Sequence, residues 1–130
     1  MKGEDISILA KIIDNIKRRG YITIEDALTI EDITGYKFSR ILDEIKRGRA
    51  KEYLFKPSGI RIYFYTGRDK EYLILPEVWF CSCMSKHPSN LLRRRVCYHL
   101  IVFWLARVLN KITTYTVDDN DYSWIIDELL

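Results

Sequence analysis

The sequence predicts an α+β fold, built from two successive units in a chain of 130 residues. Apolar residues recur at helical spacing up to about residue 48, and the spacing then changes to the alternation typical of strands. A later run, Leu100–Ala106, is apolar almost all round and predicts a buried helix at the centre of a second unit. We expect the first unit to span residues 1–68 and the second residues 69–130.

Three helices are expected in the first unit. The stripe of the first comprises Ile6, Leu9, Ile13 and Ile16, and Gly20 follows as its cap. Thr23 and Asp26 suit a capping box at the start of the second helix, and Gly35 ends it. The stripe of the third comprises Phe38, Ile41, Leu42 and Ile45, and Gly48 closes it.

A β-hairpin is expected next, because residues 51–55 and 60–67 alternate around the turn Lys56-Pro57-Ser58-Gly59. Three helices followed by a hairpin is the winged helix-turn-helix order, which residues 5–67 resemble in pattern. The resemblance implies duplex DNA contact through the third helix and the hairpin. Many such small domains bind protein instead.

The second unit is expected to begin with strands over residues 71–83, bent at Pro76, and to continue with the apolar helix from Cys97. A short extended piece and a helix from about Tyr122 end the chain. That last helix carries Trp124, Ile125 and Leu129, which would either bind a partner or fold back on the core.

Composition limits the class of protein. The chain is 48% hydrophobic and 30% charged, which favours a packed core over disorder. Its apolar runs are shorter than the ~18 residues of a membrane span, and its N-terminal sequence is unlike a secretory signal. We therefore expect a cytoplasmic protein, nucleoid-associated if it binds DNA. The absence of glutamine resembles the composition of archaeal and other hyperthermophile proteins, or is chance in a short chain.

All three cysteines and both histidines lie between residues 81 and 99. Cys81 and Cys83 would share one side of a strand, and Cys97 and His99 would share a site if they stand where a helix begins. Three thiolates and an imidazole are ligands that Zn²⁺ takes tetrahedrally, and four protein ligands indicate a closed structural site. His87 is an alternative ligand to His99, although a solvated position in a loop is the better interpretation of His87. The alternative interpretation is that no metal binds: Cys97 is a reduced core cysteine, the other two cysteines are incidental, and the histidine lies on the surface.

The pattern CxC…CxH, with a hydrophobic strand before it and an apolar helix after it, resembles the SWIM zinc-finger family over about residues 70–110. Tyr98 stands where many members have lysine. The family is implicated in DNA binding and protein contact. One branch of small archaeal and eukaryotic members pairs with a RecA-family recombinase paralogue in Shu-type complexes, so the resemblance implies an accessory subunit of homologous recombination.

Candidate DNA contacts follow from the basic residues. Their contribution to nonspecific attraction for DNA is modest, because the formal net charge of the chain is only +3. Asp43 and Glu44 on the third helix would repel phosphate, and Tyr63 and Tyr65 would stack on bases or pack the sheet. The candidates are Lys37, Arg40, Lys46 and Arg47 on the third helix, Lys56 and Arg61 on the hairpin, and Arg93, Arg94 and Arg95 in the loop between the ligand pairs.

Catalytic motifs are not visible, so we expect a protein that is not an enzyme. The first hypothesis is a zinc-stapled accessory protein of DNA repair that contacts single- or double-stranded DNA, a RecA-family partner, or both. The second is a winged-helix transcription regulator whose SWIM module serves dimerisation or protein interaction. The third is a protein-interaction module, for example of a virus or mobile element. Sequence-selective duplex binding would favour the second, and absence of nucleic-acid binding the third.

Overall fold

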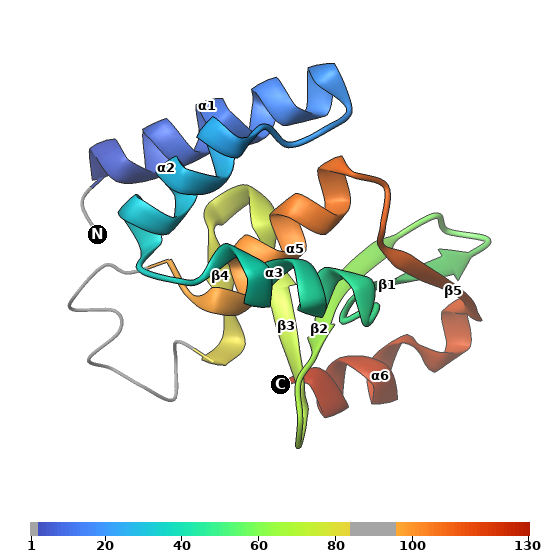
Figure 1. The fold of residues 1–130 in the computed structure, drawn as a ribbon. Coiled ribbons are helices and arrows are strands. Elements are labelled where there is room, and N and C mark those ends of the chain that lie inside the picture. Colours follow the sequence, from blue (N-terminus) through green and yellow to red (C-terminus); the bar gives the residue numbers. More distant parts are fainter. Residues whose placement is uncertain (1–2, 84–95) are drawn as a thin grey trace.

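The computed structural model describes residues 3–83 and 96–130, and it confirms a mixed α+β fold (Figure 1). The helices are α1 (Gly3–Arg19), α2 (Ile24–Thr34), α3 (Phe38–Lys46), α5 (Tyr98–Val108) and α6 (Tyr122–Leu129). The strands are β1 (Ala50–Lys56), β2 (Arg61–Thr66), β3 (Glu71–Leu75), β4 (Phe80–Cys81) and β5 (Thr113–Asp118). Short 3-10 turns are η1 (Pro76–Val78) and η3 (Asp119–Asp121).

The five strands form one sheet in the order β4-β3-β2-β1-β5. Neighbouring strands are antiparallel except β1 and β5, which run parallel from Lys51 opposite Thr113 to Lys56 opposite Asp118. The boundary expected between residues 68 and 69 falls between β2 and β3, which are paired neighbours. Both expected units therefore contribute strands to the same sheet.

The sheet separates two apolar clusters, because its side chains alternate between two faces. On one face, Tyr65 and Ile74 pack with α1, α2, α3 and α5. On the other, Phe55 and Phe64 pack with Ile125 and Leu129 of α6. Figure 1 shows α6 apart from the other helices, on the opposite side of the strands. The C-terminal helix thus folds back on the core.

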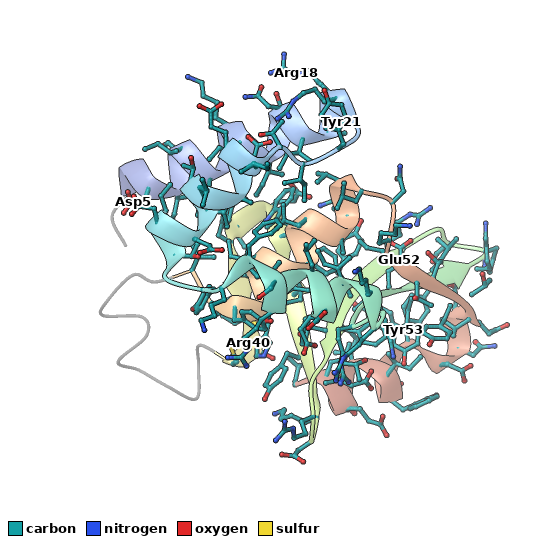
Figure 2. The ribbon with its side chains drawn as sticks, viewed as in Figure 1. Asp5, Arg18, Tyr21, Arg40, Glu52 and Tyr53 are labelled. Carbon is teal, nitrogen blue, oxygen red and sulfur yellow. The ribbon has the colours of Figure 1, made fainter. Side chains whose placement is uncertain are left out.

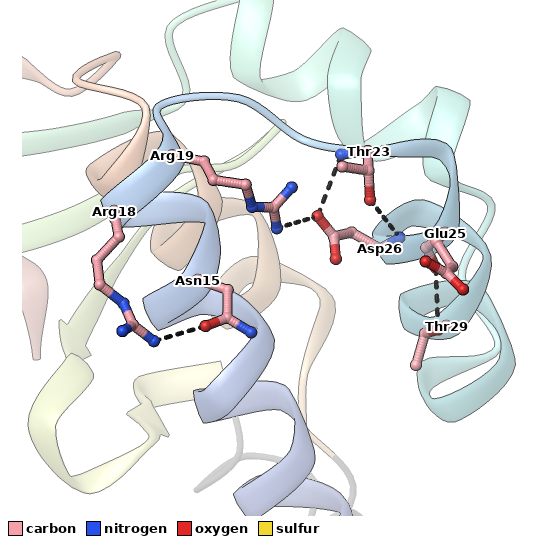
Figure 3. Close-up of polar contacts among 7 residues, drawn as sticks. All are labelled: Asn15, Arg18, Arg19, Thr23, Glu25, Asp26 and Thr29. Carbon is pink, nitrogen blue, oxygen red and sulfur yellow. Dashed lines mark hydrogen bonds and ion pairs between the residues drawn. The ribbon is translucent and has the colours of Figure 1, made fainter.

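A capping box fixes the corner between α1 and α2 (Figure 3), as the sequence predicts. The Asp26 backbone N–H donates to Thr23 Oγ1 at 3.0 Å, and the Thr23 N–H donates to Asp26 Oδ2 at 3.1 Å. Arg19 donates to the same carboxylate at 2.7 Å. The pKa of Asp26 is below its usual value because the hydrogen bonds from Arg19 and Thr23 outweigh partial burial, which acts in the opposite direction.

The helix α5 lies at the centre of the molecule. Seven of its residues are buried, and it contacts α1, α3 and β1. Its sequence is apolar almost all round because neighbours surround it, as expected for a helix inside a core. Among the described residues, no helix is both long and apolar enough to cross a membrane.

Candidate metal centre

Four side chains gather where β4 ends and α5 begins. Cys81 is the last residue of β4, Cys83 follows two residues later, Cys97 precedes α5, and His99 lies in its first turn. Their ligand atoms, three sulfurs and an imidazole nitrogen, all lie within 4.8 Å of one another. The cysteines are buried and His99 is half-buried. The sequence-predicted ligands therefore meet in space, although 13 residues separate Cys83 from Cys97 along the chain.

The start of α5 brings Cys97 and His99 together in the way that their spacing predicts. Cys97 is the N-cap, with extended backbone angles of φ −71° and ψ 156°. Its sulfur accepts a hydrogen bond from the Leu100 N–H at 3.4 Å. An N-cap residue is not yet helical, so residues i and i+2 need not diverge around the helix axis. The helix N-terminus also directs positive partial charge toward the sulfur.

Cys81 and Cys83 meet by a different route from the predicted strand alternation. The strand β4 ends at Cys81, and Ser82 and Cys83 lie in a tight turn of 3-10 type. The Leu73 backbone N–H donates to Ser82 Oγ at 3.0 Å, which fastens this turn to β3. The expectation that both cysteines lie on one strand was wrong, because the two-residue strand is too short to hold them.

Trp79 sets the direction in which the chain enters β4. Its backbone is left-handed, with φ 53° and ψ 43°, a conformation that a bulky residue adopts only at a cost of about 1–3 kcal/mol. Its indole stacks on Trp104 of α5, with ring centroids 5.5 Å apart and an interplanar angle of 29°. The stacking of Trp79, the residue after η1, on α5 offsets that strain, and β4 with Cys81 follows directly in the chain.

Two tyrosine rings hold His99. The Tyr72 ring stacks on the imidazole at 4.5 Å with an interplanar angle of 17°, and the Tyr65 ring lies 4.6 Å away. His99 Nδ1 lies 3.7 Å from Cys81 Sγ. Bond lengths of ~2.3 Å to sulfur and ~2.0 Å to nitrogen give a tetrahedral edge of about 3.5 Å, so this pair is spaced as two ligands of one ion.

The three thiols shift one another's pKa values through contacts between their sulfurs. The pKa of Cys83 is lowered, because its sulfur interacts with the Cys81 and Cys97 thiols through hydrogen bonds and faces His99. The pKa of Cys81 is raised by its hydrogen bonds to the sulfurs of Cys83 and Cys97 and by burial. The pKa of Cys97 is raised to about 12, because its hydrogen bond to Cys83 and burial outweigh the opposing effect of Cys81. A divalent cation would favour ionisation of all three.

This donor set could hold a metal ion. Thiolate and imidazole are ligands of Zn²⁺ and of other soft or borderline ions, and four of them complete a tetrahedron. Cys81, Cys83, Cys97 and His99 are therefore the candidate metal ligands, and the structure does not establish which metal they take.

The predicted basic residues lie on two elements that differ in electrostatics. Glu52 is buried, and it accepts from Arg61 Nη1 at 2.6 Å and from Thr114 Oγ1 at 2.8 Å, so the guanidinium on β2 is already paired. In the described part of the chain, none of the α3 cations has an ion-pair partner. These exposed α3 cations are Lys37, Arg40, Lys46 and Arg47. His87, Arg93, Arg94 and Arg95 lie outside the described residues.

The hairpin tyrosines are packed inside the molecule. Tyr65 is 2% exposed and touches His99, and Tyr63 lies against Phe103 and under the Arg107 guanidinium. Base stacking by these rings was one of the two interpretations of the sequence, and packing is the one that the structure supports. The role of Tyr65 and Tyr72 beside His99 was missed, because sheet alternation predicts a buried face and not what lies against it.

A depression of about 560 Å³ in the described surface is lined by Lys17, Glu77, Trp104 and Arg107, among others, and by none of the four ligands. Arg107 donates to Glu77 at 2.8 Å, so the principal charges there neutralise each other. The metal cluster is the stronger candidate site.

Comparison of the chain with family models, curated proteins and solved structures finds no match.

Proposed function

We propose that this protein is a non-enzymatic, zinc-stapled accessory protein that contacts DNA through the exposed face of α3. The observation that carries the proposal is the convergence of Cys81, Cys83, Cys97 and His99, whose ligand atoms lie within 4.8 Å of one another. The role in recombination beside a RecA-family ATPase rests on the sequence resemblance to SWIM proteins.

Zinc suits the cluster better than other metals. Three thiolates and an imidazole exclude the hard cations Mg²⁺ and Ca²⁺, which take oxygen ligands. Four protein ligands complete the tetrahedral coordination that Zn²⁺ prefers and leave no position for substrate or water. The buried cysteines also limit access to the ion. A structural ion that joins the end of β4 to the start of α5 is what this geometry supports.

The exposed face of α3 is the surface that fits a polyanion. Its buried side, Phe38, Ile41 and Ile45, packs into the core, and Arg40 and Arg47 lie on the opposite side. Glu44, which the sequence predicts to repel phosphate, instead accepts from Arg49 at 3.1 Å and from the Tyr65 hydroxyl at 3.0 Å.

Asp43 is the one α3 acid whose charge faces solvent without an ion-pair partner among the described residues. The helix and its two cap positions carry four exposed cations for this one acid, namely Lys37, Arg40, Lys46 and Arg47. The face therefore keeps an excess of positive charge, which favours phosphate contact.

The hairpin is a poorer DNA contact than the winged-helix resemblance implies. Besides the Arg61–Glu52 pair, the turn residue Ser58 donates both its N–H and its hydroxyl to Asp119, at 3.0 and 2.8 Å. Lys56 stands opposite Asp118 in the parallel register of β1 and β5. Carboxylates thus lie beside Arg61, Ser58 and Lys56. We place the DNA contact on α3 and not on Lys56 or Arg61.

Fluorescence anisotropy of the zinc-loaded protein with single-stranded and duplex DNA, over a salt series, tests the proposal. We expect steeper salt dependence than a neutral interface would show, with log affinity falling by about 0.9 per log salt for each duplex phosphate contact. Arg40→Ala with Arg47→Ala should weaken binding to all sequences and reduce the slope by about 2. Arg18→Ala is the matched control, because Arg18 projects from the far end of α1 (Figure 2) and pairs with Asp14.

Two outcomes would contradict the DNA contact. One is absence of binding to either form at about 50 mM salt, where phosphate contacts are strong. The other is equal weakening by Arg18→Ala and by the α3 variant. Preference for one duplex sequence over a random competitor would instead favour the transcription regulator, and it would leave the α3 contact in place.

A further inference from the structure

Three tyrosines connect the metal-ligating segment to α3. Tyr98, which lies between the ligands Cys97 and His99, donates its hydroxyl to the backbone carbonyl of Arg40 at 2.9 Å. Tyr36, just before α3, donates its hydroxyl to the carbonyl of Val96 at 3.1 Å. The Tyr36 and Tyr98 rings meet edge to face, with centroids 5.3 Å apart. These contacts cross between the two segments in both directions.

The third connection reaches the other end of α3. The Tyr65 ring lies against the His99 imidazole, and its hydroxyl donates to Glu44 at 3.0 Å. Glu44 in turn holds Arg49, which follows α3. The residues just before α3, its first turn and its last turn are therefore each linked to residues 96–99.

The helix α3 depends on such supports because its own N-terminus is weakly capped. Lys37 is its N-cap and makes no side-chain capping hydrogen bond. The Phe38 N–H is satisfied from α2, by Glu31 Oε2 at 3.0 Å. At nine residues, α3 is also too short to be stable on propensity alone. Its position is set by its buried face and by the tyrosine contacts.

We infer that metal binding fixes the position of α3, with Tyr36, Tyr65 and Tyr98 as the positioning residues. A metal ion would hold Cys97 and His99 to Cys81 and Cys83, and the tyrosines would pass that constraint to Arg40 and its neighbours. DNA affinity then depends on the metal, although none of the four metal-ligating residues lies on the α3 surface that contacts DNA. This inference rests on the proposed function of α3, and it states how that surface is regulated.

Hydrogen–deuterium exchange of the full chain, with zinc bound and after its removal by a chelator, tests the coupling without DNA. We expect exchange over residues 38–46 to rise about tenfold or more when zinc is removed, within the usual range of coupling between sites. The helix α6 is the internal control, because it packs against the other face of the sheet in its own apolar cluster. Equal loss of protection in α3 and α6 would overturn the inference, since zinc would then support the whole fold alike.

Tyr98→Phe tests the connection in the zinc-loaded protein, because it removes the hydroxyl and keeps the ring. We expect zinc content to stay unchanged, exchange in α3 to rise, and DNA affinity to fall several-fold. Tyr36→Phe should act in the same direction. Tyr122→Phe is the matched control, since its ring packs on Phe55 beneath the opposite face of the sheet. Wild-type exchange in α3 of both Tyr98→Phe and Tyr36→Phe would overturn the inference.

The two measurements separate the coupling from the DNA contact. If exchange in α3 responds to zinc and to Tyr98→Phe while no DNA binds, the coupling stands and the proposed function fails. If DNA binds with equal affinity with and without zinc, the contact stands and the coupling fails.

Discussion

Tyr72 supports His99 through its ring and not through its hydroxyl, because the two rings stack nearly parallel at 4.5 Å. Residues that orient a metal ligand typically contribute 10–100-fold to metal affinity. Tyr72→Leu should therefore weaken zinc binding by about that factor, measured by competition with a chelator. Tyr72→Phe, which keeps the ring, should bind zinc within about twofold of wild type. Equal affinity of all three proteins would show that the stacking does not hold His99.

Asp26 gives the α1–α2 corner a pH dependence. Its pKa in the folded protein is below the ordinary value of 3.8, so its stabilising effect is complete above that value and is lost as the pH falls through the folded pKa. Asp26→Asn should lower the free energy of unfolding by about 1 kcal/mol at neutral pH, the usual size of a cap. The difference from wild type should shrink on acidification, in denaturant titrations between about pH 5 and pH 2. A difference that is constant with pH would contradict this reading.

At the residue scale, the sequence predicts the four ligands but not what surrounds them. Cys97 and His99 could be placed at a helix start because mid-helix geometry separates residues i and i+2, and the structure confirms that placement. The supports of His99 come from β2 and β3, more than 25 residues earlier, and spacing carries no record of such contacts. The left-handed backbone of Trp79 was also unpredictable, because a bulky residue there is unfavourable locally and is held by Trp104.

The helix α6 is held to the sheet by Ile125 and Leu129. Leu129 is 2% exposed, so Leu129→Ala should lower the free energy of unfolding by about 2–5 kcal/mol in a denaturant titration. Leu130 is 73% exposed, and Leu130→Ala is the matched control, expected within about 0.5 kcal/mol of wild type. Similar losses for both variants would mean that the C-terminal helix does not pack as described.

The acid on the exposed face of α3 offers a test in the direction of gain. Asp43 shares that face with Arg40 and Arg47, so its carboxylate repels any phosphate held there. Asp43→Asn should strengthen DNA binding a few-fold at low salt and have less effect at high salt, where charge interactions are screened. Anisotropy titrations at two salt concentrations measure the change. Weaker or unchanged binding would argue against α3 as the contact.

At the element scale, local signals predicted most of the fold. Helical spacing, the Thr23–Asp26 capping box and the hairpin turn each act over a few residues, and all three appear in the structure. The pairing of β5 with β1 was not predicted, because it joins residues 62 positions apart and the extended piece has no buried side chain to reveal a partner. Long-range parallel pairing leaves no mark in the local pattern.

At the scale of the whole molecule, the candidate metal site joins the parts of one core. Cys81, Cys83 and Cys97 belong to the same apolar cluster as Ile16 of α1 and Ile41 of α3. A metal bound there acts on packing that both expected units share. In small modules metal binding free energy is largely folding free energy, so Cys97→Ser should lower the unfolding midpoint even with zinc present. A cooperative transition at the wild-type midpoint would contradict a structural role.

The zinc content of the purified chain is the most direct test of the proposed metal site. Elemental analysis, with native mass spectrometry of the intact protein, should find about one zinc per chain, as four ligands in one cluster predict. His99→Ala and Cys97→Ser should retain much less under the same conditions. A wild-type chain that stays folded and binds no zinc after dialysis against a zinc salt would contradict a structural zinc site at these ligands.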